Sequence, residues 1–158
     1  MSEPKLYMLV GLPGVGKSTY IKEMLVENPT AIIISSDNII EGFAADLCLT
    51  YNEAFLKYKD IAHSQMMQEA RYHIEAKDDI IWDQTNLTEK TRKNKLKLFP
   101  KEYYKEALIF VTSAEEHARR LTLRPGKIIP EFVMQTMQES YTMPKKEEGF
   151  DSIRIIKT

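Results

Sequence analysis

The sequence predicts an α/β fold in which a mainly parallel, five-stranded sheet carries helices on both faces. Short apolar runs alternate along the chain with longer segments whose apolar residues recur every three or four positions. Two of the runs, Ile32–Ile34 and Ile80–Trp82, are apolar without interruption, which is typical of strands covered on both faces. Strands that alternate with helices indicate parallel strands joined by right-handed crossovers.

Five short apolar runs are predicted to form the strands of this sheet. The first run ends at a glycine-rich turn, and the last lies at the end of the sequence. The predicted strands are Lys5–Val10, Ala31–Ser35, Asp79–Asp83, Ala107–Thr112 and Ser152–Lys157.

Helical segments fill the intervals between the predicted strands. The longest, Tyr51–Ala76, repeats apolar residues at spacings of three and four. Ser113 and Glu116 fit a capping box at the start of another helix. Pro130 suits the first turn of the last helix, which runs through Tyr141. The other predicted helices are Lys17–Glu27, Asn38–Leu47 and Thr88–Leu98.

Length and composition limit the kind of protein. With 158 residues, 43% hydrophobic and 28% charged, we expect residues 1–158 to form a single soluble domain. The 22 Lys and Arg residues against 23 Asp and Glu exclude a strongly basic nucleic-acid tail and a polyacidic chain. We find no signal peptide and no apolar run of membrane-spanning length. The single cysteine, Cys48, excludes a disulfide framework, and its apolar neighbours predict a reduced core residue in the cytoplasm.

A phosphate-binding loop is the strongest motif. The run Gly11–Ser18 satisfies the pattern G-x-x-x-x-G-K-[ST] between a predicted strand and a predicted helix. Glycines allow several backbone N–H groups to point at phosphate oxygens, and the helix N-terminus adds a positive dipole end. Lys17 is predicted to reach the β- and γ-phosphates, and Ser18 to hold Mg²⁺. The residues predicted to bind ATP are Gly11, Pro13, Gly14, Val15, Gly16, Lys17, Ser18 and Thr19.

Two aspartates follow predicted strands at the edge of the sheet where open α/β folds bind ligands. Asp37 comes after Ala31–Ser35 and is predicted to take a proton from the attacking hydroxyl, with capping of the next helix as the alternative. Asp83 ends the following strand and is predicted to lie near the metal or the phosphates. Thr85 and Asn86, in the polar turn that follows, are candidate substrate contacts or else ordinary loop residues.

Positive charge collects in two segments. Thr88–Lys105 has seven Lys and Arg residues against two Glu. A solvated helix face is one explanation of this segment, and a contact surface for nucleic-acid phosphates, including Arg92, is the other. The second segment contains Arg119, Arg120, Arg124 and Lys127. Arg124 and Arg120 are predicted to neutralise charge on the transferred phosphoryl group from a mobile segment. Arg119 is predicted to be a surface residue.

Taken together, these residues resemble the 5′-hydroxyl polynucleotide kinase family, in particular its phage type, over nearly the whole chain. The family's opening loop corresponds to Gly11–Thr19, its general-base aspartate to Asp37, and its Asp-x-Thr-Asn segment to Asp83–Asn86. The lid residues that match are Arg120, Arg124 and Pro130. The resemblance implies a three-layer P-loop NTPase fold with an arginine-containing lid, ATP and Mg²⁺ as cofactors, and a nucleic-acid acceptor.

The sequence departs from that family at one position. Where the family commonly has an arginine that holds a phosphate of the acceptor strand, this chain has Ile40. Kinases of a hydroxymethylated pyrimidine base in phage DNA, or of a nucleoside or small molecule, are therefore alternatives. Asp83–Asn86 is also similar to the P-loop domain of heterogeneous nuclear ribonucleoprotein U, which implies a third possibility, a nucleotide- and RNA-binding module without transfer.

We therefore expect an ATP-dependent kinase that transfers the γ-phosphate to a hydroxyl, on a nucleic acid in the first instance. The predicted catalytic residues are Asp37, Lys17, Arg124 and Arg120. The predicted metal-holding residues are Ser18 and Asp83. The candidate substrate contacts are Asp37, Asp83, Thr85, Asn86 and Arg92. The three histidines share no metal-ligand spacing and are predicted to be surface or packing residues. We expect no membrane partner, a cytoplasmic location (the host cytoplasm if the protein is from a phage), and leave the oligomeric state open.

Overall fold

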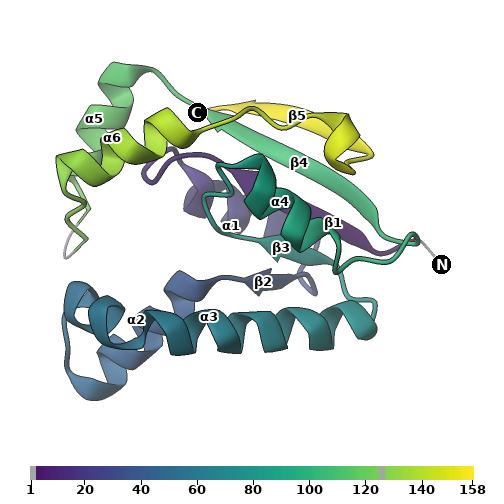
Figure 1. Cartoon of the computed structure of the whole chain (residues 1–158), viewed down its shortest axis with the longest axis horizontal. Helices are drawn as coiled ribbons and strands as arrows, with labels where there is room; N and C mark the ends of the chain where they lie inside the picture. The colour runs from purple at the N-terminus through teal and green to yellow at the C-terminus, as the bar shows by residue number, and fades with distance from the viewer. Residues whose placement is uncertain (1–2, 125–126) are drawn as a thin grey trace.

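In the computed structural model, which describes residues 3–124 and 127–158, one all-parallel sheet has the strand order β2-β3-β1-β4-β5. Figure 1 shows α3 alongside β2 at one edge of the sheet and β5 at the other edge. The strands are β1 (Lys5–Val10), β2 (Ile32–Ile34), β3 (Ile80–Trp82), β4 (Tyr104–Val111) and β5 (Ser152–Lys157). All five predicted strands are confirmed.

One strand is longer than predicted. β4 begins at Tyr104 rather than at Ala107, because it pairs with the whole of β1, with Tyr104 opposite Lys5. The backbone N–H of Tyr104 also donates to the carbonyl of Pro4 at 2.8 Å. Pairing with a neighbouring strand therefore extends β4 into polar residues that no apolar pattern marks.

The helices follow the predicted order. They are α1 (Lys17–Glu27), α2 (Ser36–Leu47), α3 (Tyr51–Glu75), α4 (Glu89–Leu96), α5 (Ala114–Thr122) and α6 (Glu131–Ser140), with a short 3₁₀ helix, η1 (Lys146–Glu148). Figure 1 shows α5 and α6 together at one end of the molecule. The segment between α5 and α6, residues 123–130, is called the lid below; residues 125–126 lie outside the described part.

The start of α2 differs from the prediction. Ser35 is the N-cap, since its hydroxyl accepts a hydrogen bond from the backbone N–H of Asn38 at 3.2 Å. α2 therefore begins at Ser36, and Asp37 lies in its first turn with an exposed side chain. The alternative that Asp37 serves as the cap is wrong, so the helix itself does not account for a carboxylate at this position.

Apolar side chains cover both faces of the sheet. Met8 belongs to a cluster that includes Met66 of α3 and Leu96 of α4. The next residue, Leu9, points to the opposite face and packs in a cluster with Ile21 of α1. Two cores around one sheet make the three layers that the sequence predicts. Across residues 3–124 and 127–158, no helix has both the length and the apolar character that a membrane crossing requires.

Cys48 is not a core residue, contrary to the prediction. It is exposed and forms the C-cap of α2, with a left-handed φ of 55°. Its apolar neighbours in the sequence therefore do not mark a buried position, because α2 ends at the surface.

Candidate active site at the carboxyl ends of the strands

The loop between β1 and α1 has the backbone shape that phosphate binding requires. Gly14 and Gly16 adopt left-handed φ angles of 84° and 100°, which residues with a side chain rarely adopt. Gly16 is the N-cap of α1 and makes no side-chain cap, so the first N–H groups of the helix are available to an anion. Lys17 and Ser18 are the first two residues of α1, as the motif requires.

Two side chains from other segments support this loop. Nε2 of His117, on α5, donates to the carbonyl oxygen of Pro13 at 2.7 Å. The hydroxyl of Thr158 donates to the carbonyl oxygen of Val15 at 2.6 Å. His117 is buried, which agrees with a packing role. These contacts hold two carbonyl groups of the loop backbone in place.

Lys17 lies at the centre of a charged cluster, here defined as Lys17, Asp37, Asp83 and Arg124. Its ammonium donates to the carbonyl oxygen of Gly11 at 2.6 Å. Burial lowers the pKa of Lys17 to about 8, the carboxylates of Asp83 and Asp37 oppose that shift, and the Arg124 guanidinium adds to it. Four residues from separate parts of the sequence are therefore close enough to act on one another.

Asp83 lies directly after β3 and is half-buried. Its backbone N–H donates to the carbonyl of Ile34 at 2.8 Å, which ties it to the end of β2. Burial raises the pKa of the Asp83 carboxyl, while the Lys17 ammonium lowers it and Asp37 raises it further. A half-buried carboxylate beside the loop lysine fits the predicted position near metal and phosphates.

Asp37 is held by Tyr51, the first residue of α3. The phenolic hydroxyl of Tyr51 donates a hydrogen bond to Oδ1 of Asp37. Burial and this hydrogen bond raise the pKa of Tyr51, so the phenol stays protonated and remains a donor. Oδ2 of Asp37 has no hydrogen-bond partner in the described part of the chain. One carboxylate oxygen is therefore positioned, and the other is available.

Lys127 of the lid contacts the hairpin of α2 and α3. The ammonium of Lys127 pairs with the carboxylate of Glu41 and lies 4.8 Å from the ring centroid of Tyr51. Lys127 also lowers, and Glu41 raises, the pKa of Asp83. The lid therefore brings positive charge to the side of the site where Asp37 lies.

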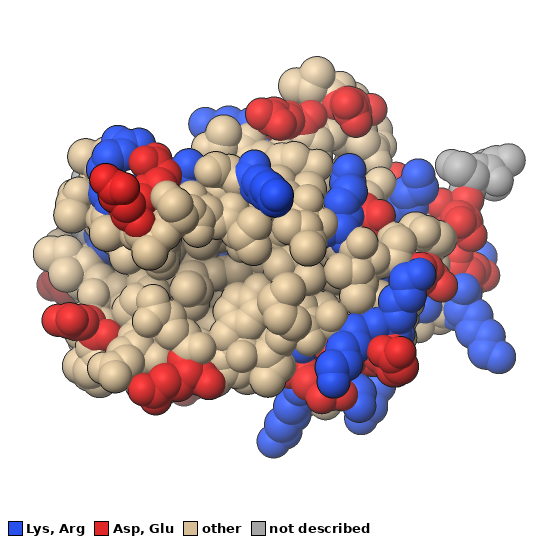
Figure 2. All heavy atoms as spheres, turned by 90° about the horizontal axis from the view of Figure 1, so that it is seen from above, with Lys and Arg blue, Asp and Glu red and all other residues tan. Residues whose placement is uncertain are grey.

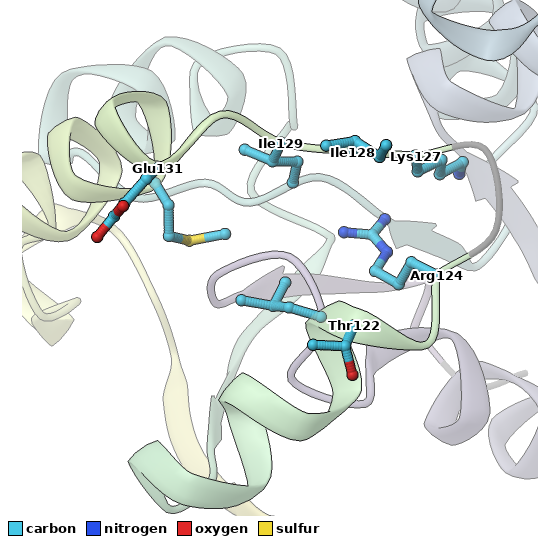
Figure 3. A pocket seen from close by; sticks show the side chains of 8 residues that line it. Thr122, Arg124, Lys127, Ile128, Ile129 and Glu131 are labelled. Carbon is cyan, nitrogen blue, oxygen red and sulfur yellow. The ribbon is translucent and has the colours of Figure 1, made fainter.

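Arg124 points into a cavity under the lid. Figure 3 shows its guanidinium directed into the space between α5 and the segment that carries Lys127 and Ile128. Among residues 3–124 and 127–158, its buried Nη1 finds no hydrogen-bond partner. A buried guanidinium N–H without an acceptor is costly, which favours an anionic ligand here. The cavity, about 390 Å³, is lined by Leu121, Thr122, Arg124, Lys127, Ile128, Ile129, Glu131 and Met134.

Arg120 lies beside the phosphate loop rather than in the charged cluster. Its Nε donates to Glu116 at 3.0 Å and its Nη1 to the hydroxyl of Thr158 at 3.0 Å. Nη1 would be 3.3 Å from a Cβ placed on Gly16. Arg119 and Arg120 donate hydrogen bonds to the Glu116 carboxylate, which lowers its pKa to about 2. Because this carboxylate binds the two arginines, Glu116 does not close the predicted capping box. Arg119 is exposed, as predicted.

Asn86 and Arg92 are internal, which corrects the expectation that they touch the substrate. Asn86 is 2% exposed, and its Nδ2 donates to the carbonyl of Leu9 at 2.7 Å. Arg92 is fully buried; its Nε donates to Glu148 at 2.7 Å and its Nη1 to the carbonyl of Asn86 at 3.0 Å. Their polar atoms are used within the protein. Thr85 accepts the Gly11 N–H through its carbonyl at 3.0 Å, and its half-buried side chain stays a candidate contact.

The segment Thr88–Lys105 is not a continuous basic surface. Besides Arg92, Lys95 is buried, and Lys93 pairs with Glu89 at 2.9 Å. Figure 2 shows positive and negative side chains interspersed over the face seen from above. The segment therefore combines two buried cations, Arg92 and Lys95, with a solvated helix face on which Lys93 pairs with Glu89, and it offers no dedicated phosphate-contact surface.

Ile40 points away from the site. It is 1% exposed and packs against Ala54 and Ala62 in the interface between α2 and α3. An acceptor phosphate therefore has no partner at this position. A cation reaches the same side of the site from the lid instead, at Lys127.

The donor set fits a magnesium ion that the nucleotide completes. Within the described ranges, no group of three or more His, Cys, Asp and Glu side chains is placed to hold a metal ion alone. Magnesium in nucleotide sites uses one or two protein oxygens together with phosphate oxygens. The Ser18 hydroxyl at the start of α1 and the half-buried Asp83 carboxylate, which lies near the Lys17 ammonium, suit that smaller set.

Sequence reasoning missed Tyr51, Glu41 and Gln84. Tyr51 and Glu41 reach the site only because α2 and α3 pack as a hairpin, and no local motif signals that packing. Gln84 donates from Nε2 to the hydroxyl of Ser36 at 2.9 Å. Its place between Asp83 and Thr85 was the one available signal.

A family model described as an AAA domain matches residues 6–144. Heterogeneous nuclear ribonucleoprotein U-like protein 2 of Homo sapiens is 25% identical over 162 residues, which is 97% of this chain. L-seryl-tRNA(Sec) kinase of Methanococcus maripaludis is 25% identical over 150 residues, or 92% of this chain. The chain spans 21% of the length of the first relative and 56% of the second.

Solved structures share the fold. A putative kinase from Chloroflexus aurantiacus J-10-fl has a TM-score of 0.74 and 15% identity, over 100% of this chain and 87% of that one. A chain in the structure of the Pnkp1/Rnl/Hen1 RNA repair complex has a TM-score of 0.67 and 20% identity, over 90% of this chain and 47% of that one. These likenesses confirm the three-layer P-loop fold.

Proposed function

This chain belongs to the AAA domain family, and from that premise we propose that it is an ATP-dependent kinase acting on a hydroxyl of a nucleic acid. One observation carries the proposal: the charged cluster brings a loop lysine, two carboxylates and a lid arginine together at the carboxyl ends of the strands. We propose that residues 1–158 act as one P-loop kinase domain.

The donor nucleotide binds at the loop between β1 and α1. Backbone N–H groups of the loop and of the first turn of α1 contact the phosphates, and Lys17 moves from the Gly11 carbonyl to the β- and γ-phosphates. Ser18 and Asp83 would hold Mg²⁺, and the ion would supply charge neutralisation on the phosphates of the bound nucleotide. Arg120, beside Gly16, adds positive charge next to the loop.

Transfer takes place between this loop and Asp37. Oδ2 of Asp37 accepts the proton of the acceptor hydroxyl as the hydroxyl oxygen bonds to the γ-phosphorus and the bond from that phosphorus to the β–γ bridging oxygen breaks. Tyr51 keeps the carboxylate oriented through Oδ1. Nη1 of Arg124, for which the described residues offer no partner, donates to an equatorial oxygen of the transferred group.

The nucleic-acid acceptor is supported by the relatives rather than by a basic surface. A relative at 25% identity is named as a kinase of seryl-tRNA(Sec). Lys127, which lies over the Tyr51 ring and pairs with Glu41, is a cation that would have to leave Glu41 to bind an acceptor phosphate on this side, where Ile40 offers no contact. The second candidate is a nucleotide- and RNA-binding module without transfer, favoured by the match to heterogeneous nuclear ribonucleoprotein U-like protein 2.

An acceptor panel tests the proposal. The chain is incubated with γ-labelled ATP, Mg²⁺ and 5′-hydroxyl DNA or RNA, DNA with 5-hydroxymethylpyrimidines, or free nucleosides. Label on a nucleic acid supports the proposal, and label on nucleosides alone would change the acceptor class. ATP binding without label on any acceptor would contradict the kinase and favour the binding module.

A further inference from the structure

Lys95 is a buried lysine whose described partners carry no negative charge. Its side chain is on α4, and the residue is 7% exposed. The ammonium donates to Oε1 of Gln84 at 2.7 Å and to Oδ1 of Asn86, and it lies 5.1 Å from the ring centroid of Trp82. Burial of a cation among neutral groups costs free energy, so this arrangement calls for a reason beyond packing.

The side-chain amides of Asn86 and Gln84, which accept from Lys95, each donate to a different segment of the candidate site. Nδ2 of Asn86 donates to the carbonyl of Leu9 at 2.7 Å, near the end of β1 where the phosphate loop begins, and also to the carbonyl of Gln84 at 3.3 Å. Gln84 donates from Nε2 to the hydroxyl of Ser36 at 2.9 Å. Ser36 precedes Asp37 in the first turn of α2.

An ammonium group fixes the orientation of both amides. Lysine offers only donors, so each amide must turn its oxygen toward Lys95 and its NH₂ group away from it. Those NH₂ groups are the ones that reach the Leu9 carbonyl and the Ser36 hydroxyl. Gln84 has a second orienting donor, since Nε1 of Trp82 donates to its Oε1 at 3.0 Å, whereas Lys95 is the one described donor to Oδ1 of Asn86.

We propose that Lys95 is a positioning residue that fixes the phosphate loop and the Asp37 turn relative to each other by orienting the side-chain amides of Asn86 and Gln84. It touches neither nucleotide nor acceptor. The proposal rests on the proposed function where it calls this geometry catalytic, but the orienting network itself does not depend on kinase activity.

The protonation of Lys95 makes the network observable. Burial lowers the pKa of Lys95 to about 7, and the Lys17 ammonium on α1 adds to the shift. The other charged group at this network is Arg92 of α4, which donates to the Asn86 carbonyl and is paired with Glu148. Titration of Lys95 should therefore move the side-chain amide signals of both Asn86 and Gln84.

The first arm of the test follows these two amide signals by ¹H–¹⁵N NMR from pH 6 to pH 9. We expect both to shift with one shared midpoint near 7 and the shift to be lost in Lys95→Met. Lys93→Met is the matched control, because Lys93 lies on the same helix and is half exposed. His117→Gln is a second control, which removes any contribution of His117, a residue that contacts the loop at Pro13, to the observed shifts. Side-chain amide signals of Asn86 and Gln84 that keep their native positions in Lys95→Met, as in Lys93→Met, would overturn the proposal.

The second arm measures ATP affinity and turnover. Lys95→Met should weaken ATP binding several-fold and lower kcat by ~10- to 100-fold, since small displacements of reacting groups have effects of that size. Gln84→Met breaks the link to Ser36 and removes the acceptor that Lys95 and Trp82 share, but it keeps the contact between Lys95 and Asn86, so it should lower kcat more than it weakens ATP binding. Lys95→Met with the ATP affinity and kcat of Lys93→Met would overturn the proposal. A native protein without transfer would contradict the proposed function, while the NMR arm and ATP affinity would still decide the role of Lys95.

Discussion

The phenolic hydroxyl of Tyr51 donates a hydrogen bond to the carboxylate of Asp37, across the hairpin of α2 and α3. Stacking of Phe43 on Tyr58, with ring centroids 4.8 Å apart, packs the same two helices together. The position of the candidate base is therefore set by packing between two helices rather than by the strand that precedes it. This relationship gives the first prediction.

Tyr51→Phe should lower kcat about tenfold and leave the KM for ATP unchanged, because it removes the donor that orients Asp37 and no contact with the loop. Steady-state kinetics with a saturating acceptor measure both constants. The control is Tyr72→Phe, an exposed tyrosine further along α3. Turnover equal to that of the control would show that the hydrogen bond has no role in transfer.

Arg124→Ala should lower kcat by roughly 1,000-fold, the contribution of an arginine that contacts a transferring phosphoryl group. ATP affinity should change much less, since Lys17 and the loop remain. Arg124→Lys should not restore the rate, because an ammonium lacks the planar set of donors. Single-turnover rates are compared with Arg119→Ala, the exposed neighbour. Equal rates for the Arg119 and Arg124 variants would exclude Arg124 from the reaction.

The buried pair of Arg92 and Glu148 should be essential for stability. Arg92→Met leaves the Glu148 carboxylate buried without its partner, so the free energy of unfolding should fall by about 3–5 kcal/mol. Urea unfolding measures the loss. Lys93→Met, which breaks a half-exposed pair with Glu89, should cost no more than about 1 kcal/mol. Comparable losses in the two variants would contradict the structural role assigned to Arg92.

Stability should rise with pH between 7 and 10. The folded-state pKa values of Lys17 and Lys95 lie at about 8 and about 7, below the ordinary 10.5, so the unfolded chain binds more protons over that range. Each group adds a slope of up to about 1.4 kcal/mol per pH unit. Urea unfolding at several pH values should show a flatter slope for Lys95→Met than for the native protein. Identical slopes would mean that burial does not lower the pKa of Lys95 in the folded protein.

Much of this arrangement could be predicted from local pattern. Uninterrupted apolar runs mark the buried parallel strands, and the glycines and Lys17 mark the phosphate loop because its backbone requires them. Charged residues were harder to place. Arg92 and Lys95 belong to a segment with the composition of a solvated face, yet both are buried. Arg92 donates to Glu148, which is distant in sequence, and Lys95 donates to Asn86, which lies in a turn. A sequence does not show which residue across the fold will meet a charge.

The cap of α2 shows the same limit on a smaller scale. Asp37 and Ser35 are both good N-cap residues, and the sequence does not decide between them. Ser35 takes the role, which leaves the Asp37 carboxylate exposed beside Tyr51. The Asp37 carboxylate is therefore not needed to cap α2, and this identifies it as the candidate base.

The most direct test of the central claim is the single-turnover rate of Asp37→Asn, measured beside its ATP affinity. Asparagine keeps the oxygen that accepts from Tyr51 but cannot take a proton, so the rate should fall by about 100- to 10,000-fold. ATP affinity should stay within about twofold, because the loop and Lys17 are untouched. Transfer at the native rate with native ATP affinity would contradict the assignment of Asp37 as the base.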